Sequence, residues 1–185
     1  MARARDGYAC YREAAEEVMA RLTLTLLGGF RAHLDPGALL AIQTRKAQAL
    51  IAYLAMPLGA VHSRDKLASL LWGNTMETTA RTSLRQTLHG LGRNLQGAHD
   101  HPLRMDGDTV SLDPSSVAVD VGEFEQQVAQ GTPEALAVAA TLYQGALLEG
   151  IAVQEPRFEE WLLRERERLH EVALKALAQL LAHRR

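Results

Sequence analysis

Residues 80–95, ARTSLRQTLHGLGRNL, read as an amphipathic helix from which the rest of the fold is predicted. At 100° per residue, four leucines of this stretch fall within an arc of about 60°, which predicts a helix anchored on a core along one side. These leucines are Leu84, Leu88, Leu91 and Leu95. The opposite side contains no acid and gathers polar and basic side chains: Thr82, Gln86, His89 and Arg93, with Arg85 and Gln96 beside them.

The residue types on this second side are those that bind nucleic acid. Arginine presents a planar set of donors to guanine edges and phosphates, and glutamine pairs with adenine. Threonine and histidine donate to phosphate oxygens. An acid-free face of this composition suits a polyanion. Taken alone it fits a solvated helix surface equally well, so the neighbouring elements decide between the two interpretations.

Two shorter helices are predicted before this helix. Thr44 is placed to cap the first and Ser63 the second, because Thr and Ser side chains accept hydrogen bonds from the first free N–H groups of a helix. Thr78 or Thr79 is placed to cap the helix that contains residues 80–95. The three helices together predict a helix-turn-helix unit with a supporting first helix.

Strands are predicted on both sides of the three helices. Residues 22–30 alternate apolar and polar side chains, and residues 38–42 form a further short apolar run after a Pro-Gly turn. Residues 103–112 predict a hairpin around Asp106-Gly107. Strands, three helices and a hairpin in this order predict a winged helix, in which the third helix enters the major groove and the hairpin touches the backbone.

The rest of the chain predicts helices, so the expected fold class is α+β: a winged helix-turn-helix with a small antiparallel sheet, followed by an all-α, tetratricopeptide-like segment. Asp120-Val-Gly-Glu123 resembles a capping box, and a long helix is expected from Pro156 to about Ala182. Phe158 and Trp161 are expected to pack this segment onto the winged helix. The expected divisions are a leader helix (1–20), the winged helix (21–114) and the helical segment (115–185).

Charge and composition favour a cytoplasmic protein without a membrane segment. The chain of 185 residues has a formal net charge of −2 and a single cysteine, so no internal disulfide is possible. Residues 21–113 carry ten Lys/Arg against seven Asp/Glu, whereas residues 114–185 carry seven against eleven. No apolar run approaches the roughly 18 residues that span a bilayer. The basic part is therefore the predicted winged helix.

An enzyme is the least favoured class, and no metal or cofactor is expected. His99-Asp100-His101 lacks a third ligand nearby in the sequence, and the Asp106 and Asp108 pair lies in a predicted hairpin with no pocket implied. No Gly-rich phosphate loop or nucleophile elbow is present in the sequence.

Several motifs, in order, resemble the antibiotic-regulatory-protein (SARP) family of bacterial transcriptional activators. The resemblance covers about residues 22–180. Its first part resembles an OmpR-type winged helix, and its second part a bacterial transcriptional activation domain (BTAD) of tetratricopeptide-like helices. The stretches that carry it are LTLLGGF (24–30), TRKAQALIAYLA (44–55), SRDKLASLLWG (63–73), ARTSLRQTL (80–88), VDVGEF (119–124), LYQGALLEG (142–150) and FEEWLLRERERL (158–169).

The resemblance implies sequence-specific binding to double-stranded promoter DNA, often at direct repeats by a homodimer, and contact with RNA polymerase. It places DNA contacts at Arg81, Arg85, Gln86, His89, Arg93 and Arg104, to which the helix face adds Thr82. The chain departs from the family at Gly90 and Gly92, where basic residues are usual, and in its short helical segment, which predicts a fragment of a longer regulator. A protein-interaction module with a degenerate winged helix therefore stays as the alternative hypothesis.

Overall fold

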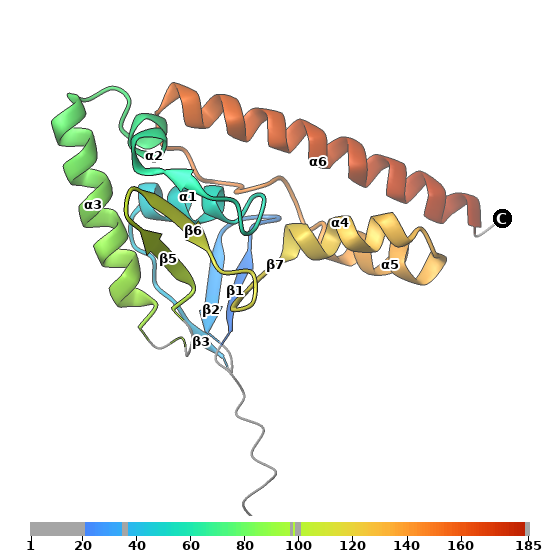
Figure 1. Cartoon of the computed structure of the whole chain (residues 1–185). Helices are drawn as coiled ribbons and strands as arrows, with labels where there is room; N and C mark the ends of the chain where they lie inside the picture. Colours follow the sequence, from blue (N-terminus) through green and yellow to red (C-terminus); the bar gives the residue numbers. More distant parts are fainter. Residues whose placement is uncertain (1–20, 35–36, 97, 99–100, 184–185) are drawn as a thin grey trace, which may run out of the picture.

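The computed structural model describes residues 21–34, 37–96, 98 and 101–183, arranged as two parts packed side by side (Figure 1). The expected leader helix over residues 1–20 lies outside the described residues. The elements in chain order are β1 (Leu22–Thr25), β2 (Arg31–Leu34), β3 (Ala38–Leu39), α1 (Arg45–Leu54), β4 (His62–Ser63), α2 (Arg64–Leu71), α3 (Glu77–Asn94), β5 (Leu103–Asp106), β6 (Thr109–Leu112), β7 (Val117–Val119), α4 (Asp120–Gln130), α5 (Pro133–Leu142) and α6 (Pro156–His183).

The strands form two small sheets, which accompany the first three helices. One has the strand order β3-β2-β1-β7, and the other has the order β4-β6-β5. β5 and β6 pair antiparallel from Leu103–Leu112 to Asp106–Thr109, and Gly107 turns the chain between them with a φ of +54°. The predicted hairpin is confirmed, and with it the α+β class and the winged-helix order of elements.

β7 was not predicted as a strand, and it joins the two parts of the molecule. It pairs parallel to β1, with Leu22 opposite Val117 and Leu24 opposite Val119. The sheet of the winged helix thus continues past residue 114. The division between residues 114 and 115 stays a prediction, and the structure adds that the first strand beyond it is hydrogen-bonded to β1.

The N-termini of the first three helices test the N-cap residues that were predicted from the sequence. Thr44 Oγ1 accepts a hydrogen bond from Ala47 N at 3.2 Å, and Ser63 Oγ accepts one from Lys66 N at 3.3 Å, so both predicted caps are confirmed. The prediction of Thr78 or Thr79 as the cap of α3 is wrong. α3 begins at Glu77 after Met76, without a side-chain cap. The helix therefore begins two or three residues earlier than predicted, and Ala80 N already donates to the Met76 carbonyl.

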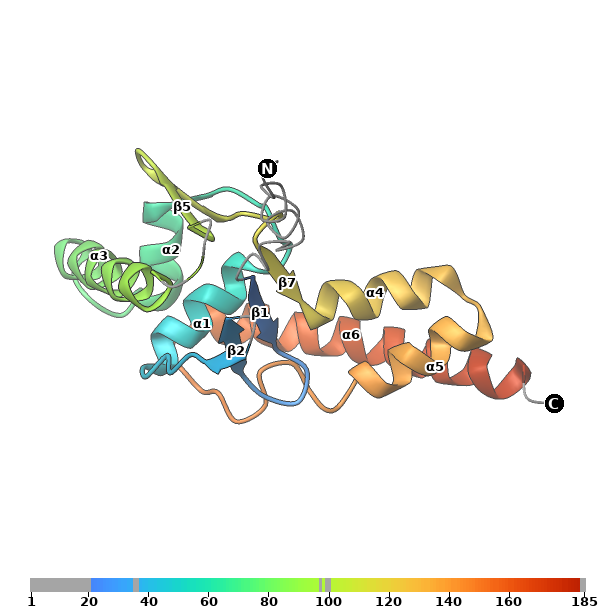
Figure 2. The ribbon, with the colours of Figure 1, turned by 90° about the horizontal axis from the view of Figure 1, so that it is seen from below.

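The helical part contains α4, α5 and the long α6, which passes beside both (Figure 2). α6 runs from Pro156 to His183, as expected, and its first turns reach back over α2 (Figure 1). Trp161 packs edge-on against Tyr53 of α1, with 4.9 Å between the ring centroids, and Phe158 is fully buried. The expected contact of Trp161 with the winged helix is confirmed, and Phe158 packs against Trp161 with 5.3 Å between the ring centroids.

Candidate nucleic-acid interface

The leucine stripe of α3 is buried as predicted. Leu84, Leu88, Leu91 and Leu95 are each at most 2% exposed. They face α1 and α2, the two helices on which α3 packs. Because the stripe fixes the rotation of α3 about its axis, the opposite face of the helix must point outward.

The outward face of α3 carries most of the predicted site residues. Arg85, Gln86, His89 and Arg93 are all exposed, and so is Thr82. Figures 1 and 2 show α3 at the edge of the molecule, away from α4, α5 and the C-terminal half of α6. Within the part of the chain that the structure describes, Arg85 and Arg93 form no ion pair. Their guanidinium groups remain available to a ligand.

Arg81, one turn before Arg85, already forms ion pairs with acidic side chains of the molecule. Its Nε donates to Asp65 Oδ1 at 2.9 Å and its Nη2 to Asp65 Oδ2 at 3.2 Å. Nη2 also lies 2.8 Å from Glu77 Oε1. The hydrogen bond to Asp65 raises the pKa of the Arg81 guanidinium, and the charges of Asp65 and Glu77 add to this effect. The acid-free face predicted from the sequence thus has two acids at its N-terminal border.

Two further predicted residues also have partners inside the molecule. Arg104 of β5 forms an ion pair with Asp113, and the hydrogen bond from Arg104 is the main reason why the pKa of Asp113 is lowered. The Thr82 hydroxyl donates to the Thr78 carbonyl at 2.9 Å. The structure therefore groups Arg85, Gln86 and His89 with Arg93 on one open face, while Arg104 stands apart on the hairpin.

The two glycines of α3 leave open space around them. A Cβ atom added to Gly90 or to Gly92 meets nothing within 4 Å. A hollow of about 600 Å³ lies beside Gly90, between α3 and the start of α1, and Gln86 and Arg93 are among its lining residues. The glycines therefore reduce the side chains presented by α3 and do not serve a close packing contact.

Arg64, which the prediction did not include, connects α2 with the hairpin that forms the wing. Its backbone N donates to the Asp108 carbonyl at 2.9 Å, and its side-chain Nε donates to the Gly107 carbonyl at 3.2 Å. Both acceptors are backbone atoms of the hairpin turn, so the sequence alone gives no sign of this contact. It holds the tip of the wing next to the start of α2.

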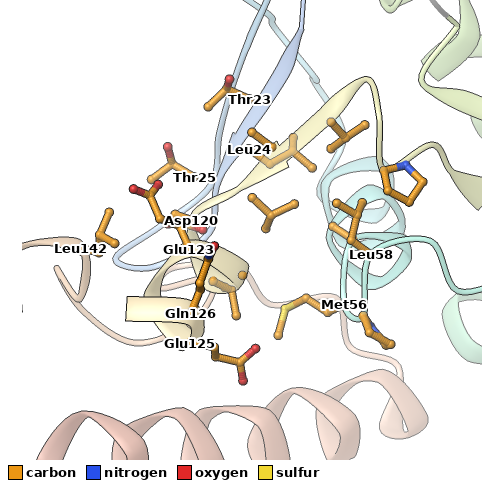
Figure 3. A pocket seen from close by; sticks show the side chains of 18 of the residues that line it. Thr23, Leu24, Thr25, Met56, Leu58, Asp120, Glu123, Glu125, Gln126 and Leu142 are labelled. Carbon is orange, nitrogen blue, oxygen red and sulfur yellow. The ribbon is translucent and has the colours of Figure 1, made fainter. Parts of the chain in front are cut away.

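A second hollow, of about 890 Å³, lies between β1, β7 and α4 (Figure 3). Asp120 is the notable residue here, because its carboxylate accepts hydrogen bonds from Leu26 N and Leu27 N, each at 2.9 Å. Burial raises the pKa of Asp120, and the two backbone hydrogen bonds oppose that shift. The expected capping-box role is wrong, since Val119 is the N-cap residue and has no side-chain cap. Asp120 instead fixes α4 to the end of β1.

Other site classes receive no support from the described residues. No group of three or more His, Cys, Asp or Glu side chains among them is arranged to hold a metal ion. His99 and Asp100 lie outside the described residues, and His101 is exposed. No helix in the described ranges is long and apolar enough to cross a membrane.

The fold is similar to that of EmbR from Mycobacterium tuberculosis, solved in complex with a low-affinity phosphopeptide. The TM-score is 0.68 at 22% sequence identity, over 84% of this chain. This chain spans 43% of the length of the EmbR chain. No family model matches the sequence, and a search of curated proteins found no match. At this identity the likeness establishes a shared fold, a winged helix followed by a helical segment.

Proposed function

We propose that the protein is a DNA-binding transcriptional regulator, an activator of the SARP kind. In this proposal α3 reads promoter DNA in the major groove, and the β5–β6 wing lies along the backbone. One observation carries it: Arg85 and Arg93 stand on an exposed helix face, without ion pairs among the described residues, while the leucines of the same helix are buried. The EmbR-like fold and the order of the SARP-like motifs support it.

The proposal extends to the partners that the resemblance implies. The α4–α6 segment would contact RNA polymerase or serve regulation, and two copies would bind direct repeats of promoter DNA in the bacterial cytoplasm. The separation of α3 from α5 and from the C-terminal half of α6 supports this division of roles (Figure 2). One surface is left for DNA and another for a protein.

DNA binding is tested by selecting bound sequences from random double-stranded DNA and then measuring their affinity at several salt concentrations. Each phosphate that the protein neutralises contributes about −0.9 to the slope of log K against log salt concentration. We expect a clearly negative slope and an enriched sequence motif. Absence of binding at low salt, or binding without salt dependence, would contradict the proposal.

The second candidate function is a protein-interaction module whose winged helix binds DNA weakly or not at all. A specific observation favours it: Arg81 and Arg104 are both neutralised inside the molecule, by Asp65 with Glu77 and by Asp113. With Gly90 and Gly92, this leaves few cations on the face of α3. The second candidate predicts a complex with a partner protein that forms without DNA.

The substitution Gly92→Arg separates the two candidates. A Cβ atom added at Gly92 meets no atom within 4 Å, and replacing a glycine inside a helix stabilises the helix by up to about 1 kcal/mol. If the scaffold docks on DNA, the new cation raises the DNA affinity strongly. If affinity is unchanged while a partner protein is bound without DNA, the interaction module is the better account.

A further inference from the structure

Three arginines from two helices meet at a small cleft between α3 and the wing. The cleft has a volume of about 390 Å³, and the buried side chain of Leu84 lies among its lining residues. Its lining consists of Arg64, Asp65, Arg81, Leu84, Arg85 and Asp108. The cleft thus lies between the two elements that a winged helix uses on DNA, the third helix and the hairpin.

The three guanidinium groups differ in what they already bind. Arg81 is held by Asp65 and Glu77, as described above, so that one guanidinium group is shared by two carboxylates. Arg85 forms no ion pair among the described residues. Arg64 is only half-buried and uses its Nε on the Gly107 carbonyl, a neutral acceptor. Arg64 and Arg85 therefore form no ion pair among the described residues, although the Asp108 carboxylate lines the same cleft.

We infer that this cleft holds one phosphate of the DNA backbone, with Arg64 and Arg85 as its donors. The inference rests on the proposed DNA binding, and it joins Arg64 to Arg85, which is already among the predicted contacts. A guanidinium group offers parallel N–H donors that match phosphate oxygens. The hydrogen bonds from Arg64 to the wing turn fix where its remaining donors can lie, so the wing acts by positioning Arg64. Of the two acids at the wing tip, Asp108 lines this cleft and opposes the phosphate, whereas Asp106 is not among the lining residues.

The test is a double-mutant cycle on DNA binding with Arg64→Ala, Arg85→Ala and the double variant. Affinity is measured over a range of salt concentrations on the selected sequence and on an unrelated one. Each single variant should weaken binding by roughly tenfold, and Arg64→Ala should do so equally on both sequences, because a phosphate contact carries no base information. Because both arginines share one phosphate, the double variant should lower the salt slope by about 0.9.

Two separate phosphates would instead lower the slope by about 1.8 in the double variant, with additive losses of affinity, and this result would overturn the inference. An Arg64→Ala variant that binds DNA like the wild type would also overturn it while leaving the proposed function intact. Absence of DNA binding by the wild type would remove both. The matched control is Arg164→Ala on α6, whose side chain is 71% exposed and paired with Glu160.

Loss of the wing contact is a separate effect of Arg64→Ala that must be measured. Arg64→Lys keeps the charge and removes the Nε donor to Gly107. If the arginine acts only by holding the wing, Arg64→Lys should lose affinity like Arg64→Ala but keep the wild-type salt slope, which would overturn the inference. If a phosphate is bound, Arg64→Lys should retain part of the affinity, and thermal unfolding of both variants should match the wild type within a few degrees.

Discussion

α3 and α6 are built on the same plan but treat their cations differently. Each is an amphipathic helix with a buried apolar stripe and a charged outer side. On α6, each lysine and arginine has a partner in the molecule. Arg164 pairs with Glu160, Arg168 with Glu125 and Glu165, Lys175 with Glu171, Arg157 donates to Ser69, and Arg166 donates to the carbonyls of Leu147 and Leu148. On α3, only Arg81 is treated in this way.

On α6 the cationic side chains already have partners within the molecule, whereas α3 has guanidinium donors that no acid of the described residues binds. An arginine that already binds a carboxylate gains little from a phosphate, because the carboxylate must first be displaced. Arg85 and Arg93 have no such competitor among the described residues. The number of cations on a helix face therefore says less about DNA binding than the number of cations left without an acidic partner.

The largest expected effect concerns the apolar stripes, where burial separates the two helices. Leu88→Ala on α3 removes a side chain that is 1% exposed, and it should lower the free energy of unfolding by about 2–5 kcal/mol. Leu174→Ala on α6 removes a side chain that is 54% exposed, and it should change stability by less than about 0.5 kcal/mol. Chemical denaturation measures both. Equal losses would show that the outer side of α6 is covered in solution.

The next effect concerns the cations themselves. Arg93→Ala should weaken DNA binding by roughly tenfold, whereas Arg164→Ala should leave it within about twofold. The two side chains are both exposed arginines, and they differ in that Arg164 pairs with Glu160 on the helical part. Fluorescence anisotropy with a labelled duplex gives both affinities. A comparable loss in Arg164→Ala would place DNA on α6 and contradict the assignment of DNA binding to α3.

A third effect concerns the joint between the two parts, at His62. This side chain is buried, and its ring packs on Tyr53, which in turn contacts Trp161 of α6. Burial, with the nearby charge of Lys66, lowers the pKa of His62 below its ordinary value of 6.5. The folded protein binds this proton less readily than the unfolded chain, so the free energy of unfolding should fall as the pH drops below about 6.5.

His62→Phe keeps an aromatic ring against Tyr53 and removes the titration. The variant should therefore lose less stability than the wild type between about pH 7.5 and about pH 5.5. Urea denaturation at the two pH values measures the difference. An identical decrease in both proteins would mean that His62 is protonated as easily in the folded as in the unfolded state.

The sequence predicted what depends on local spacing. The leucine stripe, the caps at Thr44 and Ser63 and the hairpin around Gly107 each arise from residues within a few positions of one another. The outward face of α3 followed from the stripe, because one side of a helix fixes the other. The exposure of Arg85, Gln86, His89 and Arg93 was therefore predictable.

What the sequence did not predict joins residues that are far apart in the chain. Asp120 binds the backbone of Leu26, 94 positions earlier, and β7 pairs with β1 across a similar separation. Arg81 meets Asp65 only because α2 and α3 pack together. Periodicity within one element contains no information on such contacts, so the partial neutralisation of the predicted DNA face became visible only in the structure.

The smallest effect tests the acid at the border of the DNA face against its counterpart on α6. Glu77→Gln and Glu160→Gln each remove the acid of an exposed pair four residues apart, with Arg81 and with Arg164. Each should change the stability only slightly, because such exposed pairs are screened by solvent. The two variants should differ in DNA binding. Glu77→Gln removes a negative charge beside the proposed phosphate site, so it should strengthen DNA binding by a few-fold and make the salt dependence steeper. Glu160→Gln should leave DNA binding unchanged. Equal DNA affinities in the two variants would mean that the acid at Glu77 lies too far from the duplex to repel it, and that the border of the binding face lies C-terminal to Arg81.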